Sequence, residues 1–374
     1  MPSVETKSFR ARVDQRVATT WDRRAVDRLA TADGRTHRSW TRGTAVVMAT
    51  VVHLVVLALL AGGLGLLLFG DNLVQRILGV VVLVPAVPLL RTGRVRPDIT
   101  LDPQTAPVFT ALVAELAEGL GTRPPTMIGF NEDYNAYAAR VGLRTRLLVI
   151  GAPLWAALSP QGRVALLGHE LGHFSGRDVV HGRYVWRAYQ TLHSWVALST
   201  PAYVEADGRS PLAASLVTWP LRFVSTTLLT VLDWVSSAAS RHQELLADTA
   251  AAALAGTPAA IEMLEGLMIR DVVDVAANRA AVDSRRPDLG AEIRSRVDAL
   301  TPEARRHARA EHQESRVDHT HPPSVERLRL QEALPPVTAL VELDEARTTA
   351  IDEELAPLLT LALRRTADKY RYVR

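Results

Sequence analysis

The chain has 374 residues and a formal net charge of +3, and it contains no cysteine. This length allows one large domain or two ordinary ones, and the lack of cysteine excludes disulfides and thiolate metal ligands. Basic residues are almost all arginine, because Lys7 and Lys369 are the only lysines, and they form no compact basic stripe within a recognisable DNA-binding module. The composition therefore argues against a nucleic-acid partner.

The first 43 residues are polar and rich in arginine, with acidic residues interspersed. We predict a cytosolic arm over residues 1–43. A solvated or disordered segment near anionic lipid is favoured over a specific binding element, because alternating charges leave little apolar surface to bury.

Two apolar runs follow the arm. Residues 44–69 contain no Asp, Glu, Lys or Arg and are long enough to span a bilayer, and they begin too late and run too long for a signal-peptide core. The second run, 73–90, carries Gln75, Arg76 and two prolines. We predict a transmembrane hairpin over 44–90, with a buried helical hairpin of a soluble domain as the alternative. Arginines flank both ends of the hairpin, so the positive-inside rule predicts that both ends face the cytoplasm.

A helix and a small sheet are predicted next. Asp102 and Pro103 fit a helix N-terminus, and apolar residues then recur at helical spacing as far as Leu120. Residues 126–130, 135–141 and 146–150 are typical of short strands of a mainly antiparallel sheet. An exposed edge strand of such a sheet can pair with an extended peptide, although a purely structural hairpin fits the pattern equally well.

The segment around which the chain is organised reads His169-Glu170-Leu171-Gly172-His173. Ser159-Pro160 predicts the start of a helix that contains it. On a helix, His169 and His173 project from one face and can hold one zinc ion, while Glu170 can act as general base on a water at the metal. Gly168 and Gly172 weaken the intrinsic helix propensity, so the helix is inferred from its cap and its apolar stripe.

Residues 185–237 are apolar with interruptions at Pro220, Arg222 and Asp233. Interfacial or partly buried helices are favoured over a second membrane hairpin, with a buried core pair as a third alternative. Residues 240–255 then predict a strong helix that ends at Gly256-Thr257-Pro258.

That helix carries Glu244 and Asp248, which at i and i+4 share one face. Glu244 is the best-placed candidate for a third zinc ligand, and Asp248 can orient a ligand histidine through its second ring nitrogen. Two solvated acids on an alanine-rich helix explain the same pattern equally well.

These segments together resemble the HtpX-like and CAAX prenyl-protease-like family of membrane zinc endopeptidases, of the gluzincin type. The resemblance covers about residues 100–335 and rests on four blocks in the same order. The blocks are Asn135-Ala136-Tyr137-Ala138; His169 to Phe174 with Asp178; Ser240-Arg241 with Glu244 and Ala247-Asp248; and Thr320-His321-Pro322-Pro323 with Arg327.

The resemblance implies a role for each matched position. Zinc would be held by His169, His173 and Glu244, with Asp248 behind one of the histidines. Glu170 would activate water and then protonate the leaving amine. The resemblance places two further groups at the substrate: His321 and Arg327 would hold the oxyanion, and the segment Asn135, Ala136, Tyr137 and Ala138 would form the strand that receives the substrate.

The expected fold is mainly α with a small antiparallel β-sheet, an α+β zincin-type metalloprotease domain, preceded by an N-terminal transmembrane hairpin. The predicted organisation is the arm, the hairpin, a zinc peptidase domain over 98–335 with 185–237 as a possible membrane-associated insertion, and a helical tail over 336–374.

The expected function is that of a multi-pass membrane zinc endopeptidase whose catalytic domain faces the cytoplasm. It would act on unfolded or membrane-associated polypeptides in quality control or processing, with the lipid bilayer as a second partner. The alternative is a catalytically silent membrane scaffold or sensor of the same fold. The intact Glu170 argues against that alternative, because a silent copy has no need of the base.

Overall fold

A computed structural model describes residues 40–86, 97, 99–141, 145–175, 178–200, 212–283, 288–314 and 324–372. The chain divides into two compact units. One consists of the described parts of 95–179 and 241–374, and the other of the described parts of 36–94 and 180–240. Nearly all of the predicted arm lies outside the described residues.

The first unit contains a four-stranded sheet in the order β1-β2-β4-β3. The predicted strands appear as β2 (Met127–Asn131), β3 (Ala136–Val141) and β4 (Thr145–Gly151), and a short β1 (Ile99–Thr100) adds an edge that the sequence did not predict. The sheet is mixed, because β4 pairs in parallel with β2 and antiparallel with β3. The predicted α+β class is confirmed.

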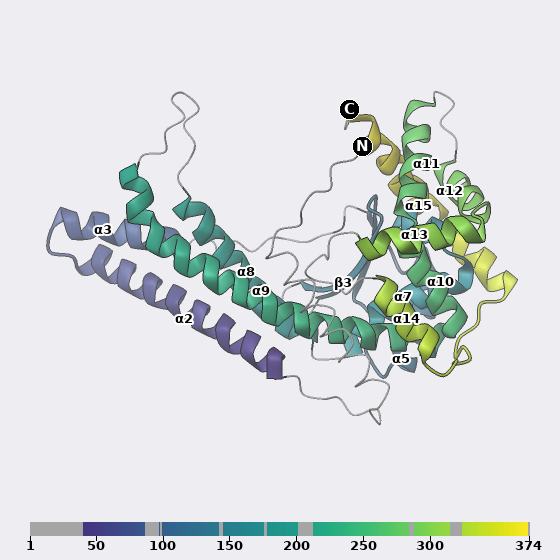
Figure 1. Cartoon of the computed structure of the whole chain (residues 1–374), viewed down its shortest axis with the longest axis horizontal. Helices are drawn as coiled ribbons and strands as arrows, with labels where there is room; N and C mark the ends of the chain where they lie inside the picture. Colours follow the sequence, from purple (N-terminus) through teal and green to yellow (C-terminus); the bar gives the residue numbers. More distant parts are fainter. Residues whose placement is uncertain are drawn as a thin grey trace. The chain divides into compact units, whose positions relative to one another are not determined.

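Helices pack with this sheet around one core (Figure 1). Fully buried side chains of the core include Phe109, Phe130, Trp155, Leu167 and Leu171. Three helices of the first unit lie before residue 180 in the chain: α5 (Pro107–Gly119), α6 (Ala152–Ala157) and α7 (Pro160–Ser175). The helices after residue 241 that lie wholly in this unit are α10 (Thr257–Met268), α11 (Arg270–Val282), α12 (Leu289–Asp298), α13 (Pro302–Glu314), α14 (Ser324–Ala333) and α15 (Glu345–Tyr372).

The start of α5 differs from the prediction. The helix begins at Pro107, and Asp102 instead closes a turn in which its carboxylate accepts a hydrogen bond from the Gln104 backbone amide at 3.0 Å. The N-terminal amides of α5 are capped from a distant helix, because the Glu354 carboxylate of α15 accepts hydrogen bonds from Val108 N and Phe109 N, each at 2.9 Å. The C-terminal helix therefore packs as part of this unit.

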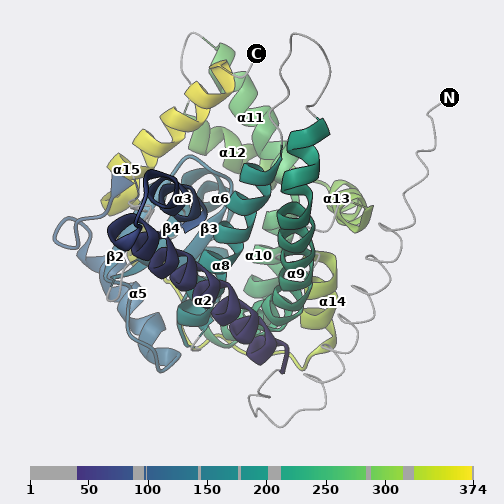
Figure 2. The ribbon, with the colours of Figure 1, turned by 90° about the vertical axis from the view of Figure 1, so that its left-hand side faces the viewer.

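The second unit consists of α2 (Trp40–Phe69), α3 (Leu73–Leu83) with the short helix η1 (Val84–Ala86), most of α8 (Asp178–Ser199) and the first part of α9 (Leu212–Ala255). One face of α2 packs on α8 and α9 (Figure 2). The indole Nε1 of Trp195 donates a hydrogen bond to the Pro85 carbonyl at 2.7 Å, which ties α8 to η1. The buried residues of this contact are Ala45, Ala49, Val52, Val56, Ala86, Ala188, Leu192, Trp195 and Leu232.

The outer face of α2 exposes large apolar side chains, among them Val47, Leu54, Leu57 and Leu68. Within the described residues, Gly43–Phe69 is the one segment long and apolar enough to cross a membrane. The second half of the predicted hairpin is α3 with η1, a shorter apolar segment.

The C-terminal part of α9 belongs to the first unit. Residues 212–255 form a single helix with Pro220 inside it. The helix ends where predicted, at Gly256, whose φ of +86° lies in the left-handed region that favours glycine.

Candidate metal centre

The helix that carries the two histidines begins as the sequence predicted. Pro160 is its first residue, and the Ser159 hydroxyl accepts a hydrogen bond from the Gly162 amide at 3.1 Å. The same hydroxyl donates to the Glu262 carboxylate of α10 at 2.6 Å, which fixes the start of α7 against its neighbour. The capped helix sets the rotational position of the residues three turns further along.

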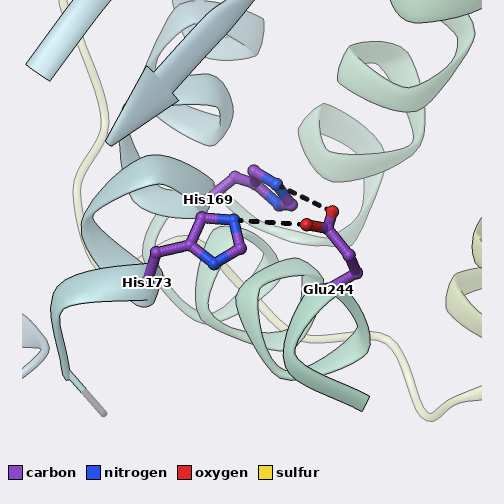
Figure 3. Close-up of side chains that lie close together, drawn as sticks. All are labelled: His169, His173 and Glu244. Carbon is purple, nitrogen blue, oxygen red and sulfur yellow. Dashed lines mark ion pairs between the residues drawn. The ribbon is translucent and has the colours of Figure 1, made fainter. Parts of the chain in front are cut away.

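His169 and His173 lie one turn apart on α7, with ring centroids separated by 4.9 Å. Glu244 of α9 points its carboxylate toward both rings (Figure 3). Its oxygens lie 3.4 Å from His169 Nε2 and 3.6 Å from His173 Nε2. Glu244 and His169 are buried, and His173 is half-buried. Residues separated by about seventy positions in the chain thus converge on one point.

This donor set fits a zinc ion. Nitrogen and carboxylate oxygen are the zinc donors open to a chain without cysteine. One donor atom from each of the three residues lies within 4.8 Å of the others. Two donors of a tetrahedral zinc ion lie about 3.3 Å apart when each bond is about 2.0–2.1 Å. The two His–Glu separations, each to a different oxygen of the Glu244 carboxylate, are close to this value.

A second layer of charge lies behind the three donors. Asp248, one turn after Glu244, places Oδ1 at 3.0 Å from His169 Nδ1. The Arg327 guanidinium of α14 donates two hydrogen bonds to Asp248, at 2.6 and 2.8 Å, and its Nη1 lies 3.4 Å from Glu244 Oε2. All three side chains are buried. A bidentate arginine–carboxylate pair fixes the carboxylate that in turn orients the histidine.

The charges around His169 change its protonation. Burial lowers the pKa of His169, but hydrogen bonds to Asp248 and Glu244 outweigh burial and raise it to about 10. Burial raises the pKa of Asp248, but the Arg327 charge outweighs it, so the net shift is downward. The imidazole therefore carries a proton at neutral pH before metal binds, and zinc, which binds neutral imidazole, has to displace it.

Two glycines bring the ligand helices together. A Cβ added at Gly172 would lie 3.1 Å from both Ala247 Cα and Ala250 Cβ, and one at Gly168 would lie 3.2 Å from Ala251 Cα. These distances are shorter than ordinary van der Waals contact, so α7 and α9 approach as closely as they do because neither glycine has a side chain. The glycines that weaken α7 as a helix thus allow the third donor to reach the two histidines.

Replacing Gly172 with alanine is therefore expected to lower zinc affinity by on the order of tenfold, because the added methyl group pushes α9 and its Glu244 away from the histidines. Competition with a chromogenic chelator measures the affinity. Gly65→Ala in α2 is the matched control, because a Cβ there meets no atom within 4 Å. Unchanged affinity in Gly172→Ala would mean that α9 adapts without moving its carboxylate.

Comparison with known protein families agrees with this geometry. A model of peptidase family M48 matches residues 103–333, more than half of the chain. The chain belongs to peptidase family M48. No curated protein and no solved structure matches it significantly. Membership of this family shows that the chain is a metalloendopeptidase, and peptidases of family M48 are zinc-dependent. The predicted membership among HtpX-like and CAAX-protease-like peptidases is confirmed.

The structure also shows where the other predicted site residues of the M48 peptidase lie. Glu170 is buried on α7 next to His169, close enough to Arg327 that its charge helps to raise the pKa of that guanidinium. Arg327 was predicted at the scissile carbonyl, and its guanidinium is found buried against Asp248 and Glu244. His321 lies outside the described residues.

The predicted substrate segment lies along an edge of the sheet. Ala136, Tyr137 and Ala138 belong to β3, and Asn135 immediately precedes the strand. Among the described residues, β3 pairs only with β4, so its other edge has no strand partner. β3 also lies beside α7, the helix that carries both histidines (Figure 1).

Sequence reasoning missed two features of this site, the close approach of α7 to α9 and the pairing of Arg327 with Asp248. A signal for the first was present, because Gly168 and Gly172 on one helix and Ala247 and Ala251 on the other share the same four-residue spacing. Nothing local to Arg327 indicates its partner, which lies 79 residues earlier in the chain.

Proposed function

We propose that this M48 peptidase is a membrane-bound endopeptidase that uses one zinc ion, held by His169, His173 and Glu244, and Glu170 as its general base. The observation that supports it best is the convergence of three buried or half-buried zinc donors from two helices, with separations that suit tetrahedral coordination. Glu170 adjoins this donor set in the sequence and is buried with it.

Each side chain has a distinct part in peptide hydrolysis. A zinc ion at this site supplies a Lewis acid that polarises the peptide carbonyl and acidifies water. Glu170 accepts the proton of the attacking water and passes it to the leaving amine, the two transfers expected of a general base that becomes a general acid. Its burial keeps bulk water from competing for that proton.

Arg327 acts as a positioning residue in this proposal. Its bidentate contact with Asp248 holds the carboxylate against His169 Nδ1, so that His169 Nε2 faces the donor set. His321 remains the group proposed to hold the oxyanion.

The substrate is proposed to bind as an additional strand along the free edge of β3. An edge strand binds an extended polypeptide through main-chain hydrogen bonds, which do not depend on its sequence. This mode of binding suits unfolded or membrane-associated substrates. Asn135 to Ala138 are the residues of this chain that would receive it. A role in quality control or processing follows from such broad recognition.

The membrane arrangement is proposed from the apolar segments and the flanking arginines. We infer that α2 and α3 form a transmembrane hairpin with both ends in the cytoplasm, since three arginines lie on each side of it in the sequence. The peptidase unit then faces the cytoplasm. The exposed apolar face of α2 supports contact with lipid.

A digestion assay on the purified full-length protein tests the proposed function. We expect casein to be degraded, degradation to stop after zinc is removed with a chelator, and activity to return on addition of Zn²⁺, with close to one zinc per chain. Degradation that continues in excess chelator, in a sample shown to contain no metal, would contradict zinc-dependent catalysis.

A further inference from the structure

Two arginines lie opposite each other on the neighbouring strands β3 and β4, at one end of β3. Arg140 of β3 and Arg146 of β4 are direct cross-strand partners. Side chains opposite each other in an antiparallel pair have Cβ atoms about 4.5–5.5 Å apart, and like charges in these positions destabilise the sheet. The two arginines share a face with Ala136, Ala138 and Leu148 by strand alternation, and that face packs on the core that includes α7.

The surroundings of Arg146 stabilise one buried cation. Its side chain is buried, with 8% of the residue exposed. The guanidinium lies 4.4 Å from the centroid of the Phe174 ring in the last turn of α7, and its Nη2 donates to Thr122 Oγ1 at 2.8 Å. The ring contact and the negative end of the α7 dipole account for one buried cation at this place.

They do not account for the second cation. Within the described residues, neither Arg140 nor Arg146 forms an ion pair with a carboxylate, and the buried Nε of each lacks a hydrogen-bond acceptor. Burial lowers the pKa of Arg146, and the charges of Arg140 and Arg123 lower it further. Two positive charges thus face each other beside a buried surface, where an anion would satisfy unpaired donors and relieve repulsion.

The position of Arg140 indicates the source of that anion. It lies on β3, the strand with a free edge, four residues or about 13 Å of extended chain beyond Ala136. A peptide that pairs with this edge would turn the side chain opposite Arg140 to the same face of the sheet. A carboxylate in that position meets Arg140 directly and lies beside Arg146.

We propose that Arg140 and Arg146 form a carboxylate-binding subsite for peptide substrates, which selects an acidic side chain or a free C-terminus about four residues along the bound strand from the residue beside Ala136. The inference rests on the proposed function, because it requires a peptide to bind along β3. It adds a charge preference to a recognition mode that is otherwise independent of sequence.

Quenched fluorescent peptides with a single glutamate moved along a neutral sequence test this subsite on the full-length protein. Glutamate at one position is expected to raise kcat/KM about tenfold over glutamine, as a charge-assisted contact in a partly buried site predicts. In Arg140→Gln the Glu/Gln ratio should fall close to one, and in Arg140→Glu lysine should be preferred at that position. Free and amidated C-termini distinguish the two sources of carboxylate.

Arg296→Gln is the matched control, because Arg296 already pairs with Glu292 on α12 at 2.7 Å, and it should keep the wild-type ratio. If peptides are cleaved with no preference for glutamate at any position, the subsite is wrong and the proposed function stands. If no peptide is cleaved, the proposed function fails. The subsite is then decided by fluorescence anisotropy of labelled Glu and Gln peptides on Glu170→Gln.

Lipid vesicles provide the competing outcome. Binding to phosphatidylglycerol vesicles over phosphatidylcholine vesicles that is lost in Arg140→Gln, together with equal affinity for Glu and Gln peptides, would assign the two arginines to a lipid headgroup and overturn the proposal. Arg140→Glu adds an independent readout. A carboxylate placed opposite Arg146 should raise the melting temperature relative to Arg140→Gln, because it replaces cross-strand repulsion with attraction.

Discussion

Replacing Glu170 with glutamine is expected to lower kcat for peptide hydrolysis by about a hundredfold to ten-thousandfold, the range that a positioned general base contributes. Glutamine has nearly the same volume as glutamate and fits the same buried place on α7, but it cannot accept the proton of the attacking water. Zinc content should stay at the wild-type level, because Glu170 is not among the three converging donors. Turnover of a quenched peptide and metal analysis of the same sample provide both measurements.

The control for this prediction is the same substitution at an exposed glutamate. Glu118 lies on the surface of α5, so Glu118→Gln should keep both turnover and zinc. Glu170→Gln also removes one negative charge near Arg327, but the guanidinium keeps its bidentate contact with Asp248, so the fold should persist. Wild-type turnover in Glu170→Gln would show that another group is the base.

Much of the candidate site could be predicted because its signals are local. Helical periodicity places His169 and His173 on one face of α7, and the same rule places Glu244 and Asp248 on one face of α9. Ser159 and Pro160 mark the start of the first helix, and Gly256 marks the end of the second. Each of these inferences depends on residues within a few turns of one another.

The features that could not be predicted depend on segments far apart in the chain. The cap of α5 comes from Glu354, about 245 residues away, and not from the local Asp102. The parallel pairing of β2 with β4 requires β3 to lie outside both, and strand patterns alone do not specify which neighbours pair. The position of Arg327 follows from the packing of α14, which its own sequence does not reveal.

Gly168 and Gly172 have opposite effects on the stability of the isolated helix and on the packing of the folded protein. Locally, each glycine lowers the stability of α7 as a helix. In the folded protein, each allows α7 to contact α9 without an intervening side chain. The cap and the buried apolar face of α7 offset the lower helix propensity of the glycines. The close approach of the helices brings Glu244 of α9 within reach of the two histidines of α7.

Replacing Glu244 with alanine should remove bound zinc. The substitution deletes one of three donors and leaves two histidines on one helix, so affinity should fall by more than the roughly tenfold to hundredfold that the loss of an outer-sphere partner costs. Arg327 keeps Asp248 as its partner, so no buried charge is left alone and the protein should still fold. Metal analysis after dialysis measures the loss, and circular dichroism confirms the fold.

Glu244→Gln separates the loss of a ligand from the loss of volume, because glutamine fills the same space without a carboxylate. Both variants should lose zinc if the carboxylate is the donor, whereas only the alanine variant should lose it if a cavity distorts the site. Asp248→Asn should show a smaller loss of affinity, because it weakens the orientation of His169 and leaves all three donors in place. Full zinc occupancy in Glu244→Ala would assign the third donor to another residue.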